Sequence, residues 1–353
     1  MRPALTRFSV IAALAALGLL AGCGSGSGGS TAAKTSTQTP KAAFTTALQG
    51  LTDTDVLTIT LKLETTPSVL IGFSKEDPKS KPLTQKQAQE IASAAFLIET
   101  KTSDGSKLSA VKPGSTSKTQ VRFALQDNGQ SLAEIRSLDN ALYLQADLKS
   151  ILDLFDKGSQ YSTITQRVSA MPPFVKAFVQ GKWVSLDLGQ LKAMASQFGA
   201  APASTSPQQG QKLLNDLHAA LGRDVTVTRV GTDSQGDHLR ISAQSRALLS
   251  DLLHTVTTNL PSASLATGAI KPTSVPDHSI VMDAWVSNGA LSKLSLDVLQ
   301  FASPGDPNGP KPGDHLPVVL QFDRSGDDIS QPSGAVPVDT SQLLTLVGSL
   351  TQK

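Results

Sequence analysis

The chain has little cysteine, few aromatic residues and no long apolar run in its body, and each shortage excludes a class of protein. Cys23 is the only cysteine among 353 residues, so the fold must hold without an internal disulfide. Two Trp and two Tyr offer few rings on which a sugar could stack. The N-terminal apolar run, residues 8–20, has 13 residues and is shorter than the roughly 20 that a membrane-spanning helix needs.

The N-terminus has the layout of a secretory signal peptide. Arg2 and Arg7 supply positive charge, residues 8–20 supply the apolar segment, and the small residues Ala21 and Gly22 follow. Residues 25–41 consist largely of Gly, Ser, Thr and Ala, which is typical of a flexible tether. We therefore expect residues 1–22 to be a signal peptide and residues 23–41 to form the tether.

The stretch Leu20-Ala21-Gly22-Cys23 resembles the bacterial lipobox. This resemblance implies cleavage before Cys23, a diacylglycerol thioether on its sulfur and acylation of the new N-terminus, with palmitate among the acyl groups. The alternative is an ordinary signal peptide with a chance cysteine. Because two or three acyl chains give stable anchoring, lipidated Cys23 predicts a protein held on the extracytoplasmic side of the cell membrane.

The net charge of the chain does not indicate a binding partner beyond the membrane. The whole chain has 31 basic and 29 acidic residues, and the expected signal peptide contains two of the basic ones and no acid. The mature chain is therefore balanced, which disfavours nucleic acid as a partner.

The body of the chain alternates between apolar and polar residues. Leu57, Ile59 and Leu61 alternate with Thr58, Thr60 and Lys62, as in a half-buried strand. The same pattern predicts strands at 56–64, 120–126, 141–148, 183–188, 225–230, 238–244, 279–286, 291–301 and 316–324. Asn-Gly pairs at 128–129 and 288–289 predict hairpin turns. One apolar and one polar face favour an antiparallel sheet, and we expect it to be continuous.

Helices are expected to cover the apolar face. Apolar residues at helical spacing predict helices at 44–51, 84–96, 188–198, 213–221, 248–260 and 343–350. Asp147, Asp187 and either Asp339 or Thr340 stand between a predicted strand and a predicted helix. These residue types are natural N-caps, so we assign them to structure and not to catalysis.

Several segments together resemble the LolA/LppX/LprG-type lipoprotein superfamily. They are "ALYLQADL" (141–148), "GKWVSLDL" (181–188), the run of strands, and "VVLQFDRSGDDISQPSG" (318–334) with Ile329 and Pro332 near its end. The resemblance implies an α+β fold, namely a strongly curved antiparallel half-barrel with helices packed on its concave face. It also implies a cavity for acyl chains. The lipobox indicates a bacterial source, and the usage of Ala, Leu, Ser and Thr suggests a high-GC, actinobacterial one.

We expect residues 42–353 to form a single such domain, with a helical insertion around 147–222. This insertion is absent from the small carriers of the superfamily, and its helices could fill the cavity.

The residues do not form a recognisable catalytic or metal-binding motif. Histidines at 218, 238, 254, 278 and 315 lack metal-ligand spacing. Ser115 and Lys118 match an S-x-x-K motif, but its partner motifs are absent. The segment 305–315 is rich in Pro, Gly and Asp and is better explained as a long hairpin loop than as a calcium site. We expect no enzyme activity, cofactor or metal.

Two functions remain open. The first is an anchored protein that binds or carries a lipid or another apolar molecule. The second is a structural or interaction lipoprotein of the cell envelope, with a filled core and no ligand. Candidate wall residues are Leu57, Ile59, Leu61, Val121, Phe123 and Leu125, and the same residues would form the core in the second case. Neither the ligand nor an envelope protein partner can be named from these patterns.

Overall fold

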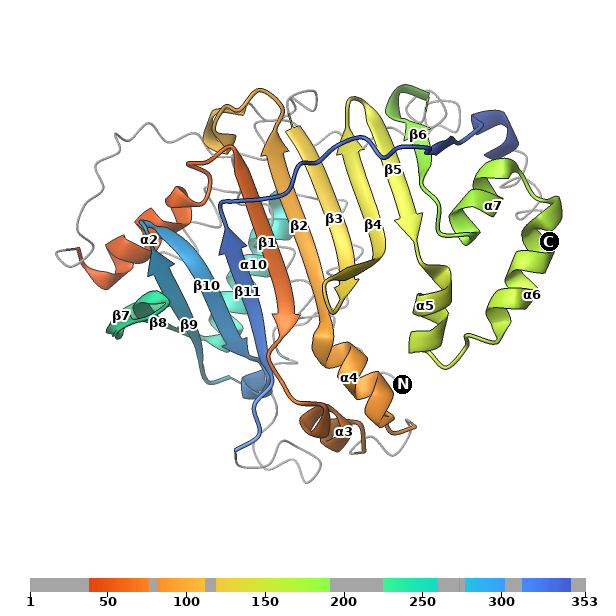
Figure 1. Cartoon of the computed structure of the whole chain (residues 1–353). Coiled ribbons are helices and arrows are strands. Elements are labelled where there is room, and N and C mark those ends of the chain that lie inside the picture. The colour runs from red at the N-terminus through yellow and green to blue at the C-terminus, as the bar shows by residue number, and fades with distance from the viewer. Residues whose placement is uncertain are drawn as a thin grey trace.

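The computed structural model describes residues 38–75, 81–111, 119–190, 225–259, 273, 277–301 and 313–343. These residues form one continuous sheet with strand order β12-β6-β5-β4-β3-β2-β1-β11-β10-β9-β8-β7 (Figure 1). All neighbouring strands are antiparallel except β12 and β6. The strands are β1 (Val56–Leu63), β2 (Ala94–Thr102), β3 (Thr119–Asp127), β4 (Gln130–Leu138), β5 (Ala141–Ala146), β6 (Val184–Asp187), β7 (Val225–Asp233), β8 (Gly236–Gln244), β9 (Ser279–Ser287), β10 (Ala290–Asp297), β11 (Pro317–Asp323) and β12 (Val336–Pro337).

Helices complete the α+β fold that the sequence predicts. They are α2 (Pro40–Gly50), α3 (Pro67–Lys75), α4 (Gln85–Ser93), α5 (Leu148–Leu154), α6 (Gln160–Arg167), α7 (Pro173–Val179) and α10 (Ser245–Asn259), with short 3-10 turns η3 (Leu108–Ala110), η5 (Val168–Ala170) and η8 (Val298–Phe301). In the part of the chain that the structure describes, β12 and β7 are the two edges of an open sheet.

Both predicted Asn-Gly turns are confirmed. Asn128 and Gly129 have φ of 49° and 79°, and Asn288 and Gly289 have φ of 51° and 73°. Two successive positive φ angles match the right-handed twist of the flanking strands. The sequence pattern missed a third such turn, at Asp139–Asn140, where φ is 50° and 61°.

Two predicted boundaries are wrong. The helix expected at 84–96 ends at Ser93, because the aromatic and aliphatic residues that follow pair as β2 between β1 and β3. The strand expected at 291–301 ends at Asp297, whose carboxylate accepts hydrogen bonds from the Leu299 and Leu316 backbone N–H groups at 3.0 Å. These bonds favour the turn η8 over a longer strand.

Other expected segments lie partly or wholly outside the described residues. The whole helix expected at 213–221 lies outside them. So do most of the helices expected at 188–198 and 343–350, and residues 191–222 of the predicted insertion. The first helix begins at Pro40, capped by the Thr39 side chain, so it includes the last two residues of the predicted tether.

The predicted caps are present. Asp147 accepts a hydrogen bond from Ser150 N, and Asp187 accepts one from Gln190 N, each at 3.0 Å. Asp339, not Thr340, accepts from the backbone of the following helical turn. Hydrogen bonds from Ser150 lower the pKa of Asp147 below its usual value.

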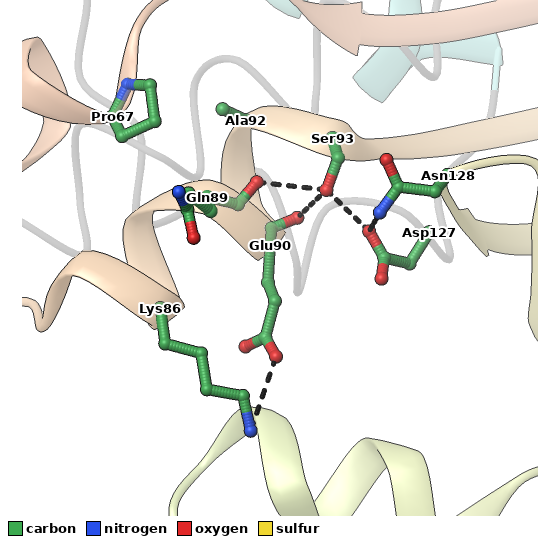
Figure 2. Close-up of a pocket in the computed structure, with 8 residues that line it drawn as sticks. All are labelled: Pro67, Lys86, Gln89, Glu90, Ala92, Ser93, Asp127 and Asn128. Atoms are coloured by element: carbon green, nitrogen blue, oxygen red, sulfur yellow. Dashed lines mark hydrogen bonds and ion pairs between the residues drawn. The ribbon is translucent and has the colours of Figure 1, made fainter.

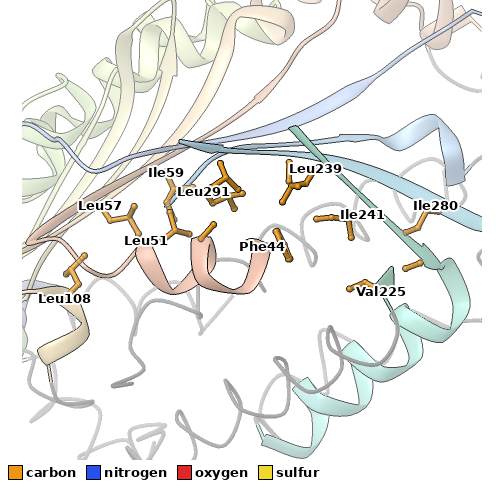
Figure 3. Packing of buried hydrophobic residues seen from close by; sticks show 14 residues of the cluster. Phe44, Leu51, Leu57, Ile59, Leu108, Val225, Leu239, Ile241, Ile280 and Leu291 are labelled. Carbon is orange, nitrogen blue, oxygen red and sulfur yellow. The ribbon is translucent and has the colours of Figure 1, made fainter. Parts of the chain in front are cut away.

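The main apolar core lies on the face of the sheet that carries α2 and α10, which we call the helix face. Figure 3 shows both helices on this side, with Phe44 of α2 and Leu51 at its C-terminal cap directed at the strands. They pack against β1, β8, β9 and β10 through a cluster that includes Leu57, Ile59 and Leu291. Two smaller clusters lie beneath α3–α4 and beneath α7.

Residues 324–335, which we call the strap, cross the opposite face. They run from the end of β11 over β1–β5 to β12 (Figure 1). Ile329 is 2% exposed and Pro332 is buried, which explains why these two residues stand out in the sequence. A Cβ at Gly326 would collide with the Glu99 carboxylate, so only glycine allows the strap to lie this close.

A charged cluster lies beneath the strap. Arg122 on β3 donates two hydrogen bonds to Glu134 on β4, at 3.0 and 3.3 Å, and lies 3.5 Å from Glu99 on β2. Arg136 donates to Glu134 at 2.7 Å and to the Ser330 carbonyl of the strap at 2.8 Å. Asp327 of the strap accepts from Arg122 at 3.2 Å. The cluster therefore ties three central strands to one another and to the strap.

The pKa values of the two buried glutamates are shifted in opposite directions. Burial raises the pKa of Glu99 above its usual value, and Arg122 only partly offsets this effect. Burial alone would also raise the pKa of Glu134, but hydrogen bonds from Arg136, Arg122 and Ser131 outweigh it and lower the pKa. Folding therefore favours the protonated form of Glu99 and the ionised form of Glu134.

These directions predict opposite effects on stability. Near pH 7, Glu99→Gln should leave the free energy of unfolding unchanged or raise it, because the contribution of Glu99 falls as pH rises through its raised pKa. Glu134→Gln should cost about 3 kcal/mol, because it removes the charged acceptor of three hydrogen bonds from Arg122 and Arg136. That cost should shrink as pH falls through the lowered pKa of Glu134. Urea unfolding across the acid range would measure both, and a larger loss for Glu99→Gln would contradict this account.

Candidate functional site

Two apolar rows run across the helix face in strand register. The first contains Ile59, Ile98, Phe123, Ile135 and Leu144, and the second contains Leu61, Phe96, Leu125, Ala133 and Ala146. Side chains two residues apart on a strand share a face, so the rows form one apolar surface from β1 to β5. Four of the six predicted wall residues lie in these rows, and the other two, Leu57 and Val121, lie on the same face in the row that Thr100 shares.

Packing covers the first row at its two ends, and Ile98 within it is 7% exposed, whereas other side chains of β2–β4 are partly open. Ile59 belongs to the core under α2, and Leu144 packs against the cluster under α7. Between them lie Phe96, Phe123, Leu125 and Ile135, which we call the apolar strip. The exposed fractions of Phe96, Leu125 and Ile135 are 38%, 36% and 37%. No strip residue belongs to the packed clusters that the described residues form.

The strip is continuous from strand to strand. Phe96 lies opposite Leu125, and Phe123 lies opposite Ile135. The rings of Phe96 and Phe123 are tilted by 31°, with centroids 6.5 Å apart. Contiguous exposed apolar side chains are uncommon on a soluble surface and mark binding sites. Chemically, the strip can bury a hydrocarbon but offers it no polar contact.

Sequence reasoning found only part of the strip. Of the predicted wall residues, Leu57 and Ile59 are core, Leu61, Val121 and Phe123 are half-buried, and Leu125 is exposed. Phe96 and Ile135 were missed because the first was assigned to a helix and β4 was not assigned as a strand. The apolar run "AFLI" (95–98), rich in residues that favour strands, and the alternation in "AEIR" (133–136) are the signals that could have identified both.

An open cleft of about 590 Å³ lies where β2 begins and β3 ends. Its lining comes from α4, from the first residue of α3 and from the β3–β4 turn (Figure 2), and consists of Pro67, Lys86, Gln89, Glu90, Ala92, Ser93, Asp127 and Asn128. Ser93 hydrogen-bonds Asp127, and the Asn128 amide donates to the same carboxylate oxygen at 3.1 Å. These bonds join the end of α4 to the end of β3.

The Glu90 carboxylate in the cleft has a partner for only one of its two oxygens among the described residues. Its Oε1 lies 3.6 Å from Lys86 Nζ, whereas its Oε2 is buried and has no hydrogen-bond partner among the described residues. A buried acceptor without a donor costs about 1–3 kcal/mol. The side chain extends from α4 into the cleft beside Lys86 (Figure 2), so a ligand in the cleft would lie next to this carboxylate.

The other residues considered from the sequence form no site in the described structure. Cys23, Ser115, Lys118, His218 and most of 305–315 lie outside the described residues. His238 contacts Asp283 and stacks on Trp285, and His315 contacts Asp297. Within the described ranges no three His, Cys, Asp or Glu residues come together in a way that could hold a metal. No helix there has the length and hydropathy needed to cross a membrane.

No protein-family model and no curated protein matches the chain. Among solved structures, the chain is similar to LprF from Mycobacterium bovis, with 9% identity and a TM-score of 0.33 over 84% of this chain and 97% of that one. It is also similar to the Mycobacterium tuberculosis lipoprotein LppX, with 8% identity and a TM-score of 0.31 over 82% and 97% of the two chains. LppX is one of the proteins in the name of the superfamily that the sequence resembles.

Substitution of two isoleucines in the same row would test whether the strip is exposed to solvent. Ile59→Ala, in the packed core, should cost about 2–5 kcal/mol of stability. Ile135→Ala should cost less than about 1 kcal/mol, because its side chain is already partly in water. Chemical denaturation of the two variants would measure the difference. Equal costs would mean that the strip is ordinary core.

Proposed function

We propose that this chain is a membrane-anchored extracytoplasmic lipoprotein that binds the hydrocarbon of a lipid, or of another apolar molecule, on the helix face of its sheet. The observation that carries the proposal is the apolar strip, which leaves four large side chains of β2–β4 outside the packed clusters. Binding would be passive. Each methylene removed from water contributes about 0.8 kcal/mol, so six would contribute about 5 kcal/mol.

The anchor part of the proposal rests on Cys23 and the residues after it. Helix α2 begins at Pro40, which leaves residues 24–39 between the acylated cysteine and the folded body. A Gly/Ser-rich coil of this length has a root-mean-square span of about 20–25 Å. The tether would therefore hold the body close to the membrane surface, within reach of lipids.

The alternative, an interaction lipoprotein with a filled core, also has support. Leu57 and Ile59, two of the predicted wall residues, belong to a well-packed cluster. Ligand binding separates the two functions, because a filled interior would take up no lipid.

Anchoring is tested at the cysteine. Cys23→Ser removes the only thiol that could take a diacylglycerol, so incorporation of a labelled fatty acid should be lost and the stable anchor with it. The matched control is Ser25→Ala, two residues further along. Fractionation and label incorporation in a bacterial host would measure both. Full labelling of Cys23→Ser would reject lipidation at this residue.

Lipid binding is tested by native mass spectrometry on protein lacking residues 1–23, purified gently from a related bacterium. We expect an added mass that organic extraction removes and that proves to be a lipid. Leu125→Asp and Ile135→Asp should each reduce it at least tenfold, because a charge on the strip opposes burial of hydrocarbon.

Val230→Asp serves as the control. Val230 is also an exposed apolar residue, 50% exposed, but it lies on the edge strand β7, away from the strip. It should keep the added mass. An unliganded mass that persists after incubation with envelope lipids would leave the interaction lipoprotein as the better account.

A further inference from the structure

The polar cleft and the apolar strip are parts of one surface. Ala94 pairs with Asp127 at the start of β2, and the next pair on the same face is Phe96 with Leu125. Two residues along a strand span about 7 Å, so the cleft begins one side-chain row beyond the end of the strip. A molecule whose hydrocarbon lies on the strip would bring its polar end to the cleft.

The charges of the cleft select the kind of polar end. Its lining has one ammonium, on Lys86, and two carboxylates, on Glu90 and Asp127, for a formal charge of −1. Lys86 already faces Glu90. A purely anionic group would meet this negative balance and would bring no hydrogen to a carboxylate.

The hydrogen-bond inventory points in the same direction. Asp127 already accepts from Ser93 and Asn128, whereas Oε2 of Glu90 accepts from no described residue. The group that remains without a partner is therefore an acceptor. A positively charged donor forms a stronger bond with a carboxylate than a neutral donor does.

We propose that the cleft binds the primary ammonium of a lipid headgroup, with Glu90 as its principal acceptor. The proposal rests on the proposed function, because it places the acyl chains of that same lipid on the apolar strip. A headgroup whose nitrogen is fully methylated has the same charge but no N–H to donate, and it should be bound less well.

The test uses the full lipidated chain reconstituted into phosphatidylcholine vesicles. Trace phosphatidylethanolamine or phosphatidylcholine is added, each with the same photoactivatable acyl chain, and cross-linking to the protein is measured. We expect the ethanolamine lipid to label the chain about fivefold more, as one hydrogen bond would give. Glu90→Gln should bring this ratio close to one, because it removes the charged acceptor of the N–H bond that only the ethanolamine lipid can donate.

Two further variants test the assignment. Glu64→Gln removes a carboxylate of the same kind just after β1, which pairs with Lys293 and Lys62, and should keep the preference. Lys86→Gln removes the ammonium that faces Glu90, so it should keep or raise the preference, and this variant still decides the matter if Glu90→Gln fails to fold.

Equal labelling of the unaltered protein by both lipids, a preference that survives in Glu90→Gln, or one that disappears in Lys86→Gln would each overturn the headgroup site. Labelling by neither lipid would overturn it together with the proposed function.

Discussion

The pairing of Arg122 with Glu134 beneath the strap is the interaction on which the central sheet depends. It joins β3 to β4 with two hydrogen bonds, and the same arginine reaches Glu99 on β2 and Asp327 on the strap. Ala124, Leu132 and Leu138 are buried on this same face. Strands β2–β4 thus take much of their burial from the strap side, and less has to come from the helix face, where the apolar strip lies.

An early strand and a late strand of the chain pair in the middle of the sheet. β1, the first strand, pairs with β11, and their neighbours divide into β2–β6 on one side and β10–β7 on the other. The strap then carries the chain back over β1–β5 to join β12 to β6. Neither half has a complete set of strand partners without the other, which supports the proposal that residues 42–353 form one domain.

Local patterns in the sequence predict the parts of this fold that depend on local physics. Alternation located most of the strands, Asn-Gly located two hairpins, and Asp147 and Asp187 were assigned as caps from their position alone. β2 was not found because "QKQAQEIAS" (85–93) continues without a break into "AAFLIETKT" (94–102), and no Gly or Pro marks the change of period. The turn at Asp139–Asn140 lacks the glycine that makes such a turn recognisable.

The course of the strap and the polar cleft depend on contacts between distant segments. Ile329 and Pro332 stood out as a motif, but the sequence does not show that they cross β1–β5, since their partners are more than 180 residues away, as with Arg136 and Ser330. Likewise, the cleft exists because Ser93 meets Asp127 across 34 residues. In such cases the residue types indicate which contacts are chemically possible. The register of the sheet determines which of these residues meet.

A protein that binds hydrocarbon must also be stable without it. Leaving a large apolar side chain exposed forgoes about 1.5–3 kcal/mol of burial, and three strip residues are each more than a third exposed. The strap offsets this loss by holding the same strands through charge pairs and buried apolar residues on the other face, independently of any ligand. Because its contacts do not involve the strip, occupation of the strip need not disturb the sheet. The strap therefore allows one face of β2–β4 to remain available for binding while the other face maintains the fold.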